Sequence, residues 1–343
     1  SPTADYESTA SVEVAEGIKT AKSDFDNMDR KLMRDAVQRA NPWELASTKG
    51  YHIFQNRAAM KMAEMDWLFN FTAREQSNPV GCEGGEHHAK LFYFADICAG
   101  PGGFTEYMVW RRQLSYRGWG FTLRGDHDFR LDKFNPNSPP RYFKLCYGAD
   151  KTGNIYSNDN MEHFASQVHD QTGGLGLSLV TADGGDSVDG EFLRQEWIMR
   201  RLALCQACTA LMVLREGGNF VCKLFDLFTP FLHDLMYLLY LHFEKTALVK
   251  PLTSRPANSE RYIVCVGLRE RRPAVVDFLL HINTLLDEST ADQRQFQEVS
   301  RLVDKNKVPA AWTEYVKDHN IVIGEDQIKY LRETMKFYED PQL

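Results

Sequence analysis

Between residues 91 and 268, short apolar runs alternate with helical patterns, and this alternation constrains the fold more than any other feature. Apolar runs of strand length occur at residues 91–98, 118–124, 141–148, 175–182, 219–226, 246–252 and 261–268. Strands that alternate with helices predict right-handed βαβ units and a mostly parallel sheet. Only the polar loop TSRPANSE joins the last two runs, so we expect these two to pair antiparallel at one edge.

Polar and helical segments flank this alternating region. Residues 1–26 are rich in Ser, Thr and Glu, which predicts a flexible N-terminal arm. We expect residues 27–268 to form the main domain, including two N-terminal helices, and residues 269–343 to form a helical extension. Outside the alternating region, helices are expected at residues 25–40, 51–72, 274–287, 290–304 and 325–338.

The composition excludes several classes of protein. With 40 Lys and Arg against 47 Asp and Glu, the net charge is −7, which argues against a basic nucleic-acid coat but not against a local basic groove. No stretch reaches the roughly 18 apolar residues of a membrane-spanning helix, so no membrane association is predicted. Seven cysteines, an odd number, favour a reducing compartment over a disulfide framework.

Cys205 and Cys208 form a CxxC pair inside the apolar run ALCQACTALMVL. Such a pair can bind zinc or undergo redox chemistry, or it can consist of two small side chains in the core. No second CxxC and no paired histidines accompany it. We therefore favour the core interpretation and predict no metal site.

The segment ADICAGPGGF, from Ala95 to Phe104, takes an apolar strand directly into a glycine-rich turn and then a helix. Ligands of α/β sheets bind beyond the carboxyl ends of strands, where glycines let the backbone approach them. The spacing is not GxGxxG, and no Lys-Ser/Thr follows, so it is neither a dinucleotide fingerprint nor a P-loop. An ordinary tight turn is the alternative, but the run of Gly and Pro beside Asp96 favours a cofactor-binding loop.

Four ionisable residues occupy unusual positions. Lys223 interrupts the apolar strand NFVCKLFDLF, where it needs a partner because an unpaired buried charge is costly. Asp183 ends the strand LSLVTA one strand–helix–strand unit earlier, although Asp before Gly is also a common turn residue. Lys61 interrupts a helical apolar stripe and could instead snorkel to water. Glu260 precedes RYIVCVGL and completes a set of two lysines and two acids that could neutralise each other.

The order of these motifs resembles a known family. Lys61, DICAGPGGF, ADGG, CKLFD and SRPANSERY are similar to the RrmJ/FtsJ-like ribose 2′-O-methyltransferases, particularly the eukaryotic cap-specific mRNA 2′-O-methyltransferases. The resemblance covers roughly residues 22–268. It implies a Rossmann-like α/β fold with a mostly parallel seven-stranded sheet, an antiparallel edge hairpin and flanking helices. Residues 27–268 would then be the methyltransferase domain.

The resemblance also implies a cofactor and a catalytic set. S-adenosylmethionine would be the methyl donor, and Lys61, Asp183, Lys223 and Glu260 would form a catalytic tetrad. A lysine amine can take or direct the proton of a ribose hydroxyl, and the cluster would hold Lys223 in line with it. Residues implied for cofactor binding are Asn56, Cys98, Ala99, Gly100, Pro101, Gly102, Gly103, Phe104, Thr105, Asn154 and Asp183.

Asn154 stands where family members often carry an Asp that contacts adenine. The triplet here is Gly153-Asn154-Ile155, and an amide can still bond the adenine edge. Asp150 is the fallback for this contact.

The implied substrate is RNA with a 7-methylguanosine cap, either mRNA or a small capped RNA, methylated on the first transcribed nucleotide. The implied cap-pocket residues are Lys22, Phe25, Glu191, Arg255 and Asn258. A loosely packed arm is the alternative for Lys22 and Phe25. A phosphate track is expected at the cofactor end of the sheet, from Arg111, Arg112, Arg117, Arg124, Lys250 and Arg255. Transcription or capping machinery as a partner, and a nuclear location, follow from the family alone.

Two other interpretations remain open at this stage. The same tetrad could act on ribosomal RNA or on an internal leader nucleotide. The second interpretation is a catalytically silent RNA-binding module of the same fold, although such a module has no reason to bury Lys223. A nicotinamide-dependent dehydrogenase is disfavoured by the spacing of the glycine turn.

Overall fold

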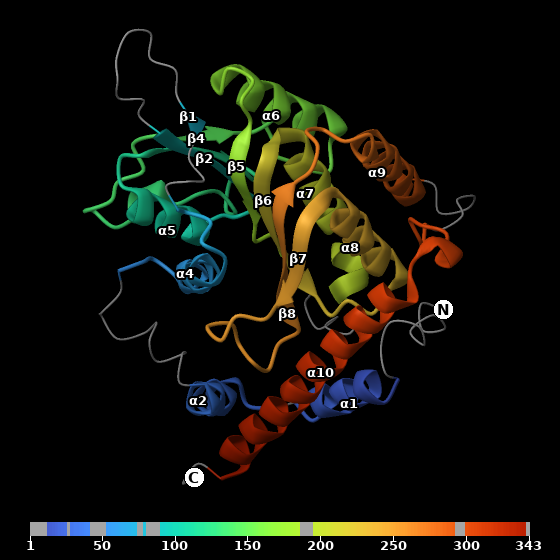
Figure 1. The fold of residues 1–343 in the computed structure, drawn as a ribbon. Helices are drawn as coiled ribbons and strands as arrows, with labels where there is room; N and C mark the ends of the chain where they lie inside the picture. The colour runs from blue at the N-terminus through green and yellow to red at the C-terminus, as the bar shows by residue number, and fades with distance from the viewer. Residues whose placement is uncertain are drawn as a thin grey trace.

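The computed structural model describes residues 12–25, 28–41, 53–73, 78–79, 90–185, 195–291 and 299–340. One sheet runs through the centre of this part of the chain (Figure 1). Its strands are β1 (Asn78–Pro79), β2 (Lys90–Ile97), β3 (Tyr116–Phe121), β4 (Phe143–Cys146), β5 (Leu177–Ala182), β6 (Leu214–Phe225), β7 (Phe243–Val249) and β8 (Glu260–Leu268). Their order is β4-β3-β2-β5-β6-β8-β7, and β1 pairs with β2 off this path.

The direction of the strands follows the alternation in the sequence. Strands β4, β3, β2, β5 and β6 are parallel, whereas β8 runs antiparallel to both β6 and β7. The short connection of residues 250–259 explains this reversal, because it contains no crossover helix. The predicted sheet with an antiparallel edge hairpin is therefore confirmed. The two-residue strand β1 was not predicted.

Helices cover both faces of the sheet (Figure 1). On one face, α4 (Ala58–Phe69) and α5 (Gly103–Arg112) enclose an apolar cluster that includes Met62, Phe94 and Val264. We call this the α4–α5 face. The opposite face, which we call the α7 face, is covered by α6 (Asn158–Gln171), α7 (Gln195–Val213), α8 (Pro230–His242) and α9 (Val275–Ala291).

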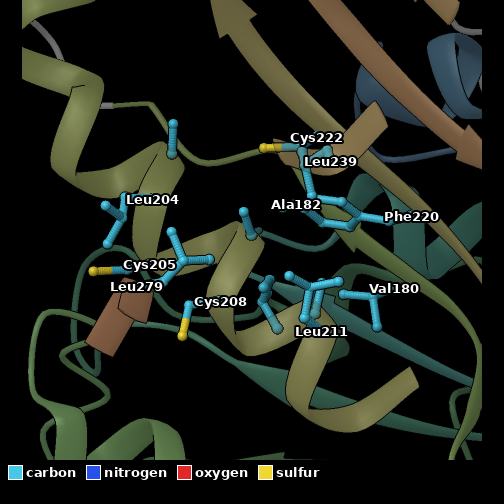
Figure 2. Close-up of a cluster of buried hydrophobic side chains, with 14 of the residues drawn as sticks. Val180, Ala182, Leu204, Cys205, Cys208, Leu211, Phe220, Cys222, Leu239 and Leu279 are labelled. Carbon is cyan, nitrogen blue, oxygen red and sulfur yellow. The ribbon is translucent and has the colours of Figure 1, made fainter. Parts of the chain in front are cut away.

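The α7 face is an apolar core that contains the CxxC pair. Figure 2 shows Leu211 of α7 beside Val180 of the sheet, and Cys205 and Cys208 on the side of α7 that faces Leu279 of α9; each of these side chains is at most 1% exposed. Burial raises the pKa of the Cys208 thiol to about 12 and that of Cys205 well above its ordinary value. Among the described residues, no group of three or more His, Cys, Asp or Glu side chains could hold a metal ion. The two cysteines are core side chains.

The prediction of a flexible arm over residues 1–26 was wrong for Val12–Ser23, which form helix α1. Its buried residues Val14, Ile18 and Ala21 lie on one side and pack toward helix α10 (Ala310–Glu339). The crossing is close, since a Cβ at Gly324 of α10 would overlap Val14. An isolated helix of this length is marginal in water, so packing on α10 stabilises α1 in a way that composition does not reveal.

Several helices begin or end at residues other than those predicted. The helix expected at residues 25–40 is α2 (Arg30–Ala40), because Asp29 caps it by accepting hydrogen bonds from the Lys31 and Leu32 amides. The helix expected at 51–72 is the shorter α4. None of the described helices combines the length and apolar character that crossing a bilayer requires.

The C-terminal extension also differs from the prediction. α9 extends to Ala291. Of the helix expected at 290–304, residues 292–298 lie outside the described residues and residues 299–304 are not helical. The helix expected at 325–338 begins much earlier, at Ala310, directly after Pro309. Proline fits the start of a helix because its missing N–H has no partner there, and this signal was overlooked.

Candidate active site

Strands β6 and β8 bring polar side chains to the α4–α5 face. Lys223 pairs with Tyr262, and Phe225 pairs with Glu260. Alternate residues of a strand share a face, so Lys223, Tyr262 and Glu260 all project to the same side. Because β8 runs against β6, its first residue, Glu260, lies at the end of the sheet where β5 and β6 finish. Helix α4 lies beside this end (Figure 1).

The four predicted residues Lys61, Asp183, Lys223 and Glu260 form one ionic cluster, which we call the tetrad. Lys61 Nζ lies 2.7 Å from Glu260 Oε1. Lys223 Nζ lies 3.3 Å from Asp183 Oδ1 and donates to the Asp183 carbonyl oxygen at 2.7 Å. The Tyr262 hydroxyl links the two ion pairs, because it donates to Asp183 Oδ1 at 2.8 Å and accepts from Lys61 Nζ at 3.4 Å. Four separate stretches of the chain thus meet at one place.

The charges of the tetrad set the state of its acid and its neighbouring phenol. Burial would raise the pKa of the Glu260 carboxyl, but the positive charges of Lys61 and Lys223 outweigh it and lower this pKa to about 2. Burial, followed by the charges of Asp183 and Glu260, raises the pKa of the Tyr262 hydroxyl well above its usual value. At neutral pH, Glu260 is therefore an anion and Tyr262 a neutral hydrogen-bond donor.

Lys250, which follows β7, fixes the chain that leads to Glu260. Its ammonium donates to the carbonyl oxygens of Asn258 and Glu260 at 2.7 and 2.8 Å. Burial and the charge of Arg261 lower the pKa of Lys250 to about 7. Ser254 Oγ donates to Glu260 Oε1 at 2.7 Å. Lys250 therefore binds the protein's own backbone, which corrects its predicted place in the phosphate track.

Helix α4 holds the same connection from the other side. The carboxylate of Glu64 accepts from the amides of Leu252 and Thr253 at 2.8 and 3.1 Å. Glu64 lies about one helical turn after Lys61. The helix that supplies Lys61 thereby also positions the connection that ends at Glu260.

Asp96, at the end of β2, supports the glycine-rich turn from within. Its carboxylate accepts from the Thr105 amide at 3.0 Å, from the Thr105 hydroxyl at 2.7 Å and from the Thr181 hydroxyl at 2.6 Å. Burial raises the pKa of this carboxyl to about 7, although these hydrogen bonds lower it. Asp96 is 0% exposed. It therefore joins the turn to β5 and does not face a ligand.

The predicted cofactor residues gather at this turn. Gly102 has a φ of 104°, which a residue with a side chain rarely adopts, and a Cβ at Gly103 would overlap Asn56 Oδ1. Cys98, with a φ of 52°, is in the left-handed region although it is not a glycine. Such backbone strain often occurs at ligand-binding sites.

The turn and the tetrad are neighbours. The ring centroids of Phe104 and Tyr262 lie 5.9 Å apart, and a Cβ at Gly184 would lie 2.9 Å from Cys98 Cβ. The side chains of Phe104 and Thr105 are buried, so they shape the turn from inside. Ala99 is also buried, whereas Pro101 of the cis Gly100-Pro101 peptide is exposed.

Asn154 follows β4, at the same end of the sheet. Its Oδ1 accepts from the Tyr156 amide at 3.0 Å, and its carbonyl oxygen accepts from Asn160 Nδ2 at 3.0 Å. Asp150 accepts from the Thr152 amide and hydroxyl, which chiefly lower its pKa. Both candidates for the adenine contact thus have local partners that fix their orientation.

The five predicted cap residues lie in different regions. Arg255 and Asn258 are in the connection just before Glu260. Lys22 and Phe25 are half-buried at the end of α1 and in the turn after it. Glu191 lies outside the described residues.

The predicted phosphate track was wrong for three of its arginines. Arg117 is the second residue of β3, and Arg112 donates to the Ser115 carbonyl oxygen just before that strand. Arg111 and Arg112 end α5, which runs back against the strands and carries them to the amino end of the sheet. Arg124, which follows β3, is at the carboxyl end as predicted.

Sequence reasoning missed Tyr262, although a signal was present. Tyr262 is two residues after Glu260 in the same strand, and this spacing places both side chains on one face.

The sequence of this chain is similar to those of known methyltransferases. The FtsJ-like methyltransferase family model matches residues 54–268. The chain is 42% identical over 334 residues to cap-specific mRNA (nucleoside-2'-O-)-methyltransferase 1A of Caenorhabditis briggsae, covering 92% of this chain and 38% of that protein. It is 43% identical over 329 residues to the cap-specific mRNA (nucleoside-2'-O-)-methyltransferase 1 of Danio rerio, with 94% and 39% covered.

A third relative is named as inactive. The inactive cap-specific mRNA (nucleoside-2'-O-)-methyltransferase 1B of Caenorhabditis briggsae is 41% identical over 334 residues, with 92% of this chain and 39% of that protein covered. The chain thus spans well under half the length of each of these relatives.

Proposed function

Because this chain belongs to the FtsJ-like methyltransferase family, we propose that it methylates a ribose 2′-oxygen of capped RNA, with S-adenosylmethionine as donor. The target we propose is the first transcribed nucleotide after a 7-methylguanosine cap. The observation that carries this proposal is the tetrad beside the glycine-rich turn, with Lys61 paired to Glu260 and Lys223 to Asp183. The names of the relatives, which are cap-specific, support capped mRNA as the substrate class.

The residues around the turn fit this cofactor. S-adenosylmethionine has polar ends and a positively charged sulfur, and here the backbone at Gly102 and Gly103 approaches its surroundings closely while Asp183 supplies negative charge nearby. When bound, it supplies a methyl carbon that is electrophilic because the attached sulfur is positive. The residues that we propose to hold it are Asn56, Cys98, Ala99, Gly100, Pro101, Gly102, Gly103, Phe104, Thr105, Asn154 and Asp183.

Lys223 is the residue that we propose to orient the ribose hydroxyl. A hydroxyl is a weak nucleophile, and its oxygen reacts best when its proton is directed away from the line of attack. Asp183 fixes the Lys223 ammonium through two contacts, at 2.7 and 3.3 Å. Lys61 and Glu260 fix the other half of the cluster and balance its charge. Groups held in this way need little rearrangement when the substrate reacts.

For the cap we propose a pocket formed by Lys22, Phe25, Glu191, Arg255 and Asn258. Methylated guanine is a flat cation, which favours an aromatic face and a carboxylate. Phe25 would supply the face and Glu191 the carboxylate. Glu191→Ala should then lose the preference for a methylated over an unmethylated cap dinucleotide, and unchanged preference would remove Glu191 from the pocket. We also propose a nuclear location, because capping accompanies transcription, and imaging of a tagged chain tests it.

A catalytically silent RNA-binding module is the second candidate function. One relative, 41% identical to this chain, is named as inactive, and this name supports a silent module as a candidate. The paired tetrad favours activity, because a module that only binds RNA has no use for two largely buried, paired lysines beside the glycine-rich turn.

Mapping of the transferred methyl group decides between these functions. The protein is incubated with methyl-labelled S-adenosylmethionine and short RNAs that begin with a 7-methylguanosine cap, an unmethylated cap or a triphosphate. We expect label on the 2′-oxygen of the first nucleotide of the methylated-cap RNA. Label at an internal position, or on ribosomal RNA supplied as a fourth substrate, would assign a different target. Cofactor binding without label on any RNA would support the silent module.

A further inference from the structure

Helix α10 contacts chain segments next to the tetrad through two buried amide side chains. Asn320 is 1% exposed and Gln327 is 0% exposed, although amides are mostly found on protein surfaces. They lie about two helical turns apart and therefore share one side of α10. Gln327 Nε2 donates to the Ala257 carbonyl oxygen at 3.1 Å, in the connection that leads to Glu260. This side of α10 thus faces the chain segments next to the tetrad.

Asn320 bridges the ends of the two strands that carry Lys223 and Glu260. Its Nδ2 donates to the Leu227 carbonyl oxygen at 2.8 Å, just beyond the end of β6. Its Oδ1 accepts from Arg261 Nη1 at 2.7 Å, and Arg261 directly follows Glu260 in β8. One side chain of α10 therefore links β6 to β8 at the end of the sheet where the tetrad lies.

Arg261 depends on this bridge. Its guanidinium is 0% exposed, and burial lowers its pKa to about 10 although the charges of Asp226 and Glu196 oppose this. Its Nε donates to the Ser259 carbonyl oxygen at 3.2 Å, and its Nη2 has no hydrogen-bond partner in the described part of the chain. A buried cation with few acceptors depends strongly on each of them. The Asn320 carbonyl group is one of these acceptors.

The other end of the bridge holds an unusual backbone. Asp226 and Leu227 have φ angles of 51° and 100°, which residues with side chains rarely adopt. Glu196 of α7 accepts from the Leu227 amide at 3.2 Å, and Asn320 donates to the Leu227 carbonyl oxygen. The amide and the carbonyl group of Leu227 are thus both hydrogen-bonded to side chains. Strained backbone persists only where its surroundings fix it, and Asn320 is part of those surroundings.

We propose that Asn320 is a positioning residue for methyl transfer, which keeps Lys223 and Glu260 in register by holding the ends of β6 and β8. This inference rests on the proposed function, since the register matters to a reaction only if the tetrad acts on substrate. The family match ends at residue 268, so a helix beyond the matched range would contribute to the site. A displacement of about 1 Å at reacting groups can lower a rate by about 100-fold.

Asn320→Asp is the sharpest test because it separates the two bonds. The variant keeps an oxygen for Arg261 but replaces the donor to Leu227 with a second oxygen. We expect kcat on capped RNA to fall by about 10-fold or more, while KM for the RNA and Kd for S-adenosylmethionine change by less than about twofold. Hydrogen exchange at the amides of residues 226–228 should become faster.

Thr334→Val is the matched control. Thr334 is also a buried polar residue of α10, at 2% exposure, but its hydroxyl donates within the helix to the Tyr330 carbonyl oxygen at 2.8 Å. This variant should leave kcat and the exchange rates unchanged. If Asn320→Asp does not fold, Asn320→Ala removes both bonds without adding charge, and the same loss of kcat is expected.

Two outcomes would overturn the proposal. One is an unchanged kcat in Asn320→Asp, whatever its exchange rates. The other is an equal fall in kcat for Asn320→Asp and Thr334→Val, which would mean that α10 only stabilises the fold. Absence of methyl transfer by the wild-type protein would instead overturn the proposed function, and the exchange measurement then decides alone whether Asn320 holds the two strand ends.

Discussion

The two sides of strand β6 carry different chemistry. Toward the α7 face, Cys222 and Leu224 are 1% and 2% exposed inside an apolar core. Toward the α4–α5 face, Lys223 lies between them in sequence and pairs with Asp183. The same strand is therefore held by apolar burial on one side and carries charge on the other. Hydrophobic burial on the α7 face offsets the cost of placing a lysine in a central strand.

This comparison predicts a division of effects. Substitutions in the tetrad should lower activity more than stability, whereas substitutions on the α7 face should do the reverse.

Lys223→Ala should lower methyl transfer by at least about 1000-fold, because the variant loses the group that we propose to orient the hydroxyl. Cofactor affinity should remain largely intact. Labelled methyl transfer and titration calorimetry measure the two quantities. Lys245→Ala, at an exposed lysine of β7, is the control and should be fully active. Full activity of Lys223→Ala would reject the assignment of the tetrad.

Leu211→Ala should lower the free energy of unfolding by about 2–5 kcal/mol, because Leu211 is 1% exposed and its loss leaves a cavity on the α7 face. Urea denaturation measures this change. The kcat per folded molecule should match the wild type. A stable variant with a low kcat would show that the α7 face affects the reaction more than it affects stability, which contradicts this prediction.

Glu260 should make the stability of the protein depend on acid pH. Its folded-state pKa of about 2 lies below the ordinary value of 4.5, so its contribution is fully present above about pH 4.5 and is lost as the pH falls toward 2. The stability gap between wild type and Glu260→Gln should therefore shrink as the pH falls through this window.

The exposed Glu244 of β7 provides the control for this pH series. Denaturation curves of Glu244→Gln should keep a gap from wild type that stays small from pH 6 to pH 3. A pH-independent gap for Glu260→Gln would contradict the ion pair with Lys61.

Cys208→Ala should have the smallest effect, a loss of about 1 kcal/mol in the free energy of unfolding, because the change removes one small buried group. Activity should be unchanged, and a zinc chelator should affect neither protein. Loss of activity on chelation would revive the zinc interpretation of the CxxC pair.

The sequence predicted what depends on local pattern. Strand and helix alternation gave the sheet, and Lys223 was detectable because a lysine is out of place in an apolar strand. The signal at Lys61 was weaker, because a surface lysine that snorkels to water gives the same sequence pattern. Only the contact with Glu260 in the structure distinguishes a tetrad member from a snorkelling lysine. The family resemblance, not the pattern, placed Lys61 in the tetrad.

What escaped prediction depends on contacts between distant segments. α1 is stabilised by α10, which lies about 300 residues later, so its own composition suggested a loose arm. Arg111 and Arg112 were misplaced because the direction in which α5 returns along the sheet is a property of the fold. Asn320 gave no signal, since a single amide in a long helix usually faces water.

The reversal of β8 has a consequence for synthesis. A ribosome releases the chain from its amino terminus, so the glycine-rich turn, Asp183 and Lys223 all emerge before Glu260 does. A nascent chain can build the donor pocket and still lack the carboxylate that neutralises Lys61. On the proposed function, catalytic competence then requires insertion of the reversed strand between β6 and β7, and α10 follows that strand in the chain.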